Sequence, residues 1–319
     1  MQKIFIVLGV VVLSVVGVLM WKKQAAPDQM SQNQEKISVV ATFYPLEDFA
    51  RAVGGNRAEV TSIVPAGAEP HEYEPTPQDI LKAYQADIVL LNGAGVDAWA
   101  EKIRPELEQR GIKVVQMSEL MTLLPGAHEE EEEGAEAEEH EESPFDPHFW
   151  LDPKSVEKEV AAIRDAFVSR DPAGKAVYDR NSEAFLANLE GLDASYRMGL
   201  ASCELHSVVT SHNAFSYMGQ RYGFETIPLA GLSPESEPSS RRLAEVAQLV
   251  KEQGIKHVFF ETLVNPKLAQ TLATETEAEP LVFNPLEGLT DEERAAGENY
   301  LSIMKQNLEN LKTALQCQK

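Results

Sequence analysis

The feature that most constrains the fold is an alternation of short apolar runs with longer amphipathic segments, which recurs along most of the chain. Short runs rich in β-branched residues predict strands, and segments with apolar residues three or four positions apart predict helices. Strands that alternate with helices in this way form parallel sheets with helices on both faces. The sequence therefore predicts an α/β protein.

The predicted strands fall into two groups of four. They cover residues 37–42, 58–64, 87–92 and 113–117, and then 207–211, 225–229, 257–260 and 281–283. The predicted helices cover residues 46–53, 76–86, 96–110, 153–168, 172–198, 214–222, 239–252, 266–275 and 291–315. We expect two lobes, each with a four-stranded parallel sheet flanked by helices, and a long helix that bridges them.

The 319 residues are enough for two domains of ordinary size. We expect the following division: an N-terminal signal or membrane anchor with a polar tether at 1–36, an N-terminal lobe at 37–170, a linking helix at 171–200 and a C-terminal lobe at 201–319.

Residues 4–21 carry no charge and have lysines on both sides. This pattern is typical of an export signal or an N-terminal membrane anchor, so we expect the protein to work outside the cytoplasm, in the periplasm or at the cell surface. Ala25 and Ala26 offer a cleavage region, and no cysteine near the end of the run could carry a lipid. Whether the segment is cleaved stays open.

The net charge of −23 argues against nucleic acid as a partner and is compatible with attraction of cations. Ten glutamates lie within residues 128–142. Without their ten negative charges, the net charge of −23 becomes −13 for the rest of the chain. This segment also holds His128 and His140 and lacks an apolar period, which predicts a mobile loop. It could sample metal or serve only as a solubilising insert.

Cys203 and Cys317 are the two cysteines of the chain. In an exported protein, such a pair predicts a disulfide that fastens the last helix, with two free thiols as the alternative.

Residues 146–153 read DPHFWLDP and place His148 between two Asp-Pro pairs. Because proline fixes its own φ and restricts the preceding residue, the two pairs make stiff corners around the imidazole. Such stiffness suits a metal ligand. The alternative is an ordinary loop histidine, with Asp152 as the N-cap and Pro153 in the first turn of the next helix.

Four side chains of the kinds that bind metals follow predicted strands. Ligands of open parallel sheets lie just beyond the carboxyl ends of the strands, so these side chains could line one cleft between the lobes. The four are His71, His148, His212 and Glu287. Three imidazoles and one carboxylate form a closed tetrahedral set that suits zinc.

Each of these residues also has an ordinary interpretation. His71 could be a surface residue of its proline-rich loop, His212 a neighbour of a helix N-cap, and Glu287 one more acid on an acidic protein. Glu261 also ends a strand, and it could replace Glu287 or accept a hydrogen bond from a ligand imidazole. His206 lies at the opposite end of a strand and is not assigned to the site.

Three motifs, at residues 67–75 (GAEPHEYEP), 146–153 and 210–215 (TSHNAF), resemble those of the zinc and manganese solute-binding proteins of ABC importers, the cluster A-I group with the ZnuA and AdcA types. The resemblance covers nearly all of the chain after the tether. It implies two lobes joined by a rigid helix, one metal ion between them, and delivery to a membrane permease and its ATPase. The metal ligands that it implies are His71, His148, His212 and Glu287.

We therefore expect an extracytoplasmic zinc receptor that is a monomer and not an enzyme. Histidine at position 212 matches the zinc-type pattern of the family, and a manganese or iron receptor is the alternative. Three histidines also hold zinc in hydrolases, but Glu287 would close the position that a catalytic zinc leaves open to water. A surface adhesin is a third class, which nothing in the sequence favours.

Overall fold

The computed structural model describes residues 36–126, 143–234 and 238–318, which belong to one compact unit that begins at Lys36. The predicted export signal or anchor and the acidic segment with His128 and His140 lie outside these ranges. Among the described residues, no helix is both long enough and apolar enough to cross a membrane.

The eight strands form two four-stranded parallel sheets, which confirms the predicted fold class. The first sheet has the order β2-β1-β3-β4 and the second the order β6-β5-β7-β8. The strands are β1 (Ile37–Ala41), β2 (Ala58–Ser62), β3 (Ile88–Leu91), β4 (Lys113–Gln116), β5 (Ser207–Thr210), β6 (Glu225–Pro228), β7 (His257–Phe260) and β8 (Glu279–Val282). β8 begins two residues earlier than predicted, because an edge strand tolerates Pro280.

Helices cover both faces of the first sheet. Successive strand residues point to opposite faces, so Val39 and Ala41 belong to one core cluster and Val40 to another. The first cluster packs against α2 (Tyr44–Gly54), α5 (Pro153–Arg170) and α6 (Lys175–Gly199), and the second against α3 (Pro77–Gln85) and α4 (Ala98–Gln109).

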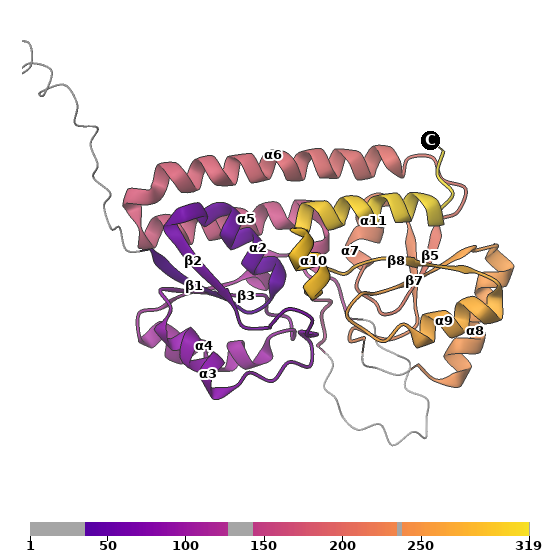
Figure 1. Ribbon diagram of the computed structural model, residues 1–319, viewed down its shortest axis with the longest axis horizontal. Coiled ribbons are helices and arrows are strands. Elements are labelled where there is room, and N and C mark those ends of the chain that lie inside the picture. The colour runs from indigo at the N-terminus through magenta and orange to yellow at the C-terminus, as the bar shows by residue number, and fades with distance from the viewer. Residues whose placement is uncertain (1–35, 127–142, 235–237, 319) are drawn as a thin grey trace, which may run out of the picture. The chain divides into compact units, whose positions relative to one another are not determined.

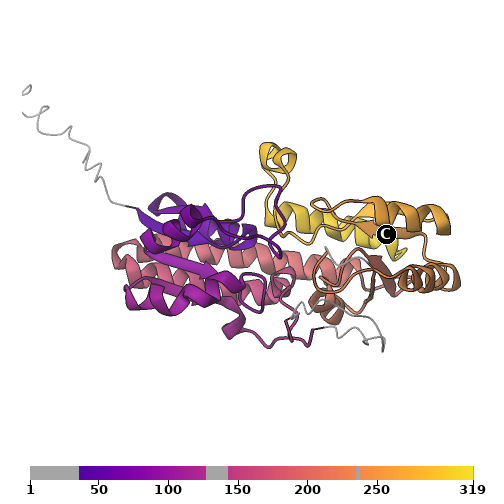
Figure 2. The same ribbon diagram turned by 90° about the horizontal axis from the view of Figure 1, so that it is seen from below.

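The second sheet is covered in the same way. One face packs against α8 (Ser240–Gln253) and α9 (Lys267–Thr276) and the other against α7 (Ser216–Tyr222) and α11 (Tyr300–Ala314). The cluster beneath α6 includes buried residues of both lobes, so one core runs through the molecule on this side. Figure 1 shows α6 along the top of both lobes, and Figure 2 shows the lobes side by side along its length.

The prediction of a single closing helix over residues 291–315 is wrong. The structure has two helices there, α10 (Asp291–Ala296) and α11. Gly297 ends α10 in the left-handed conformation, with φ 77°, and Asn299 then caps α11 by accepting a hydrogen bond from the backbone N–H of Ser302. The chain changes direction between the two helices and buries Tyr300.

A disulfide joins Cys203 to Cys317, as predicted. The backbone N–H of Leu205 also donates to the carbonyl of Leu315, at 3.0 Å. The covalent bond and this hydrogen bond fasten the segment after α6 to the segment after α11.

Candidate metal centre

Four side chains from loops beyond the carboxyl ends of β2, β4, β5 and β8 meet at one point. Nε2 of His148 lies 3.2 Å from Nε2 of His71 and 3.3 Å from Nε2 of His212. Oε1 of Glu287 lies 3.1 Å from the Nε2 atom of His212, 3.3 Å from that of His71 and 3.4 Å from that of His148. The four groups could hold one metal ion, since each offers a ligand atom within 4.8 Å of the others.

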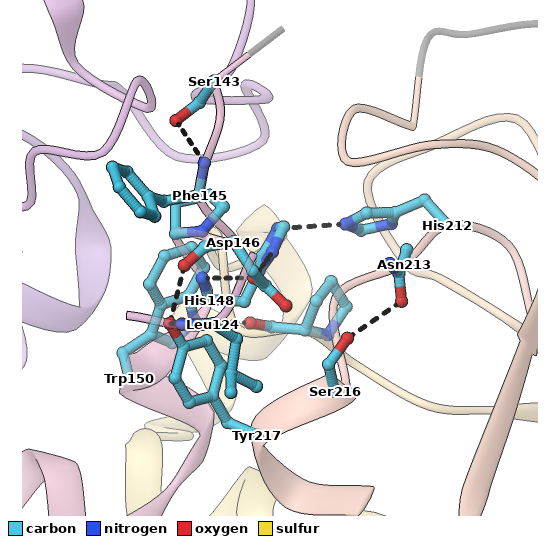
Figure 3. Close-up of polar contacts among 12 residues, drawn as sticks. Leu124, Ser143, Phe145, Asp146, His148, Trp150, His212, Asn213, Ser216 and Tyr217 are labelled. Atoms are coloured by element: carbon cyan, nitrogen blue, oxygen red, sulfur yellow. Dashed lines mark hydrogen bonds and ion pairs between the residues drawn. The ribbon is translucent and has the colours of Figure 1, made fainter. Parts of the chain in front are cut away.

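His148 is fixed by the turn that precedes it. Oδ1 of Asp146 accepts two hydrogen bonds from His148, one from the backbone N–H at 2.9 Å and one from Nδ1 at 2.8 Å. The chain then forms a 3₁₀ turn over Phe149–Leu151, and Asp152 caps α5 by accepting from the N–H of Lys154. The imidazole is thereby held with Nε2 toward the other ligands, and Figure 3 shows it facing His212.

His212 follows β5 and is completely buried. Its Nδ1 lies 2.8 Å from Oε1 of Glu261, which follows β7 in the same sheet. Because a hydrogen bond at one ring nitrogen fixes the tautomer and orientation of the other, Glu261 directs Nε2 of His212 into the centre. The structure thus places Glu287 beside the three Nε2 atoms and Glu261 behind one imidazole.

Glu287 is held by an unusual local conformation. Leu286 has φ 59°, and its N–H donates to Oδ1 of Asn284 at 2.8 Å. Asn284 is in turn fixed by two hydrogen bonds with the side chain of Asn307, on α11. The left-handed conformation is unfavourable for leucine, and the hydrogen bond to Asn284 holds the chain in it just before Glu287, whose Oε1 lies near the three imidazoles.

His71 lies on the proline-rich loop after β2. The N–H of Gly67 donates to the carbonyl of Leu289 at 2.9 Å, which ties this loop to the segment that carries Glu287. Oε2 of Glu69 accepts from the N–H of His71 at 2.9 Å. The loop is therefore positioned by contacts with both lobes.

Three buried aromatic residues join the lobes behind the centre. Nε1 of Trp150 donates to the carbonyl of Pro285 at 2.8 Å. The hydroxyl of Tyr300 donates to the carbonyl of Trp150, and that of Tyr217 to the carbonyl of Asp146, each at 2.8 Å. The segment around His148 is thus held by the opposite lobe as well as by its own (Figure 3).

Burial and the neighbouring charged groups shift the pKa values of His212 and Glu287 in opposite directions. Burial disfavours protonation of His212, but the carboxylates of Glu261 and Glu287 outweigh it and raise the pKa of His212 well above its ordinary value. Burial would raise the pKa of Glu287, but the charge of His212 and hydrogen bonds from the imidazoles hold it well below its usual range.

The two remaining imidazoles differ. Burial lowers the pKa of His71, because its effect exceeds the opposite effect of the Glu287 carboxylate. Burial also acts on His148, but hydrogen bonds to Asp146 and Glu287 prevail and raise its pKa. Protons therefore compete with a metal ion more strongly at His148 and His212 than at His71.

The four residues singled out in the sequence are the four that the structure brings together. His257 lies at the start of β7, the opposite end of its sheet, and the exposed His206 precedes β5. The hydrogen bonds that His148 donates to Asp146 and that the N–H of His71 donates to Glu69 were not predicted. The signal for Asp146 was a carboxylate two residues before the histidine, within reach of both its N–H and its ring.

The fold and the centre define a two-lobed metal-binding protein. A family model described as "ZnuA: Zinc-uptake complex component A periplasmic" matches residues 39–314. The chain belongs to this family, whose members are metal-binding components of uptake systems and not enzymes.

Curated relatives and solved structures agree with this assignment. "Zinc-binding lipoprotein AdcA" of Streptococcus pneumoniae is 38% identical over 287 residues, which are 90% of this chain and 57% of that protein. The chain thus spans little more than half the length of that relative. "High-affinity zinc uptake system protein ZnuA" of Bacillus subtilis is 38% identical over 281 residues, 88% of each chain. The crystal structure of the Zn(II)-bound ZnuA-like domain of S. pneumoniae AdcA is similar with a TM-score of 0.75 and 37% identity, over 88% of this chain and 99% of that one.

Proposed function

We propose that the protein is the extracytoplasmic zinc receptor of an ABC importer, which captures the ion between its lobes and delivers it to a membrane permease. His71, His148, His212 and Glu287 are the proposed ligands. The family and the zinc-binding relatives support this function, and the N-terminal apolar segment supports a place outside the cytoplasm.

The observation that carries the proposal is the set of ligand distances. Ligand atoms about 2.0–2.1 Å from a tetrahedral zinc ion stand roughly 3.3–3.4 Å apart. The five separations given above run from 3.1 to 3.4 Å. The sixth separation, between the Nε2 atoms of His71 and His212, is at most 4.8 Å, so an ion at the centre would need these two imidazoles to close around it.

The donor types favour zinc over manganese. Manganese prefers oxygen donors, whereas imidazole suits zinc, and three of the four groups are imidazoles. The fourth group, Glu287, fills the position that a catalytic zinc site leaves to water. The centre is therefore suited to binding an ion and not to turnover.

The test is metal content of the purified full-length protein after zinc and manganese are offered together. We expect about one zinc per chain and little manganese. The His212→Ala variant should lose most of the zinc, while His206→Ala, which removes an exposed histidine outside the centre, should keep it. Preferential manganese binding, or equal zinc in both variants, would contradict the proposal.

A further inference from the structure

A cavity of about 730 Å³ lies beside the metal centre and includes His71 in its wall. Both lobes line it, with Ser143 and Phe145 from the first and Leu232 from the second. The cavity therefore opens at the junction of the lobes.

His71 is the most exposed of the four proposed ligands. Its side chain is 10% exposed, whereas those of His148 and His212 are 0% and that of Glu287 is 1%. Since an ion must first meet a ligand that solvent reaches, His71 is the point of first contact. The side of the metal centre that solvent reaches, at His71, is therefore part of the cavity wall.

The cavity wall has one sign of charge. Glu72 and Glu101 line it, and none of the described residues that form the wall is lysine or arginine. Glu72 is exposed and directly follows His71, while Glu101 is half-buried and belongs to α4. A concave surface with carboxylates and low-dielectric walls concentrates a divalent cation and speeds its association.

We propose that this cavity is the entry route of the ion, and that Glu72 and Glu101 steer the hydrated cation to His71 before the other three ligands complete its coordination. The two glutamates set the rate of association without coordinating the bound ion. This inference rests on the proposed function of the centre.

The test is stopped-flow measurement of zinc association and dissociation with the full-length protein and its Glu72→Gln/Glu101→Gln variant. At low ionic strength we expect the association rate constant of the variant to fall about fivefold or more. The dissociation rate should change less than about twofold, and the difference in association should shrink in concentrated salt, where charges at this distance are screened.

The matched control is Glu183→Gln/Glu190→Gln, which removes the same charge from exposed positions on α6, opposite α4 in Figure 1. This variant should associate with zinc nearly as fast as the unaltered protein. Equal association rates in the two double variants would overturn the entry route while leaving the zinc centre intact. Failure of the unaltered protein to bind zinc would overturn the proposed function itself.

Discussion

At the scale of single residues, two of the three imidazoles have a carboxylate on the ring nitrogen that faces away from the centre. Asp146 serves His148 in this way, and Glu261 serves His212. Such a partner fixes the tautomer and ring orientation and makes the imidazole a better donor. The affinity of the centre should therefore depend on residues that never touch the ion.

For Asp146→Ala, we expect zinc affinity about 10–100-fold weaker than that of the unaltered protein, since His148 loses the acceptor at Nδ1. Asp146→Asn keeps an oxygen acceptor and should recover part of the loss. Competition with a chelator of known affinity measures both variants. An Asp146→Ala variant with undiminished affinity would show that His148 needs no orientation from Asp146.

Zinc binding should release protons and weaken in acid. Neighbouring carboxylates raise the pKa values of His148 and His212 above their ordinary value in the metal-free protein, so these imidazoles hold their protons to higher pH than a free histidine does, while the pKa of Glu287 is lowered and favours its ionised form. Zinc must displace those protons, so affinity rises with pH until the raised pKa values are passed. Calorimetry in buffers of different ionisation enthalpy should show a net release of protons that grows as the pH is lowered. Zinc binding without proton release at any pH tested would contradict the raised pKa values of His148 and His212.

At the scale of elements, the parallel strands explain why the centre could be predicted. The carboxyl ends of parallel strands share one edge of a sheet, so a histidine or carboxylate just after a strand has a defined location. His212 lies two residues beyond β5, so its location was the simplest of the four to predict. His71 and His148 lie at the ends of longer loops, and only their proline-rich surroundings and the family motifs indicated where the loops would place them.

The break between α10 and α11 could not be predicted in the same way. Residues 291–315 keep an apolar helical period through Gly297, and a glycine within a helical pattern can be either tolerated or terminal. Two features decide the outcome. Asn299 provides a new N-cap, and burial of Tyr300 favours the change of direction, which only the tertiary structure reveals.

Gly297→Ala should lower the free energy of unfolding by about 1–2 kcal/mol, because alanine is strained at φ 77°. Apart from chain neighbours, no heavy atom of the described residues lies within 4 Å of the position a Cβ would take, so the cost is conformational and not steric. Gly191→Ala, also free of contacts but inside α6, should instead stabilise by about 0.5–1 kcal/mol. Denaturant unfolding measures both, and destabilisation by both variants would contradict this account.

At the scale of the whole molecule, the lobes are joined by more than the long helix. The core beneath α6 contains residues of both sheets, and Trp150, Tyr217 and Tyr300 donate hydrogen bonds between the lobes. Arg221 on α7 also pairs with Asp152, the N-cap of α5. Cross-lobe contacts of this kind were not predictable, because their partners lie far apart in the sequence, 150 residues in the case of Tyr300 and Trp150.

Arg221→Gln should lower the free energy of unfolding by about 1–3 kcal/mol, because it leaves the buried carboxylate of Asp152 without its cationic partner. Lys175→Gln removes the cation of an exposed ion pair with Asp179 and should cost at most about 1 kcal/mol. The comparison is made by denaturant unfolding of the metal-free proteins. Equal losses would mean that the pair between the lobes contributes no more than a surface pair.

The central claim is that one zinc ion is bound by His71, His148, His212 and Glu287. The most direct measurement is a crystal structure of the zinc-loaded protein, with anomalous diffraction recorded on both sides of the zinc edge. We expect one strong peak among the three Nε2 atoms and a Glu287 carboxylate oxygen, about 2.0–2.2 Å from each. A peak at any other group of residues, or a bound ion that lacks Glu287, would contradict the account.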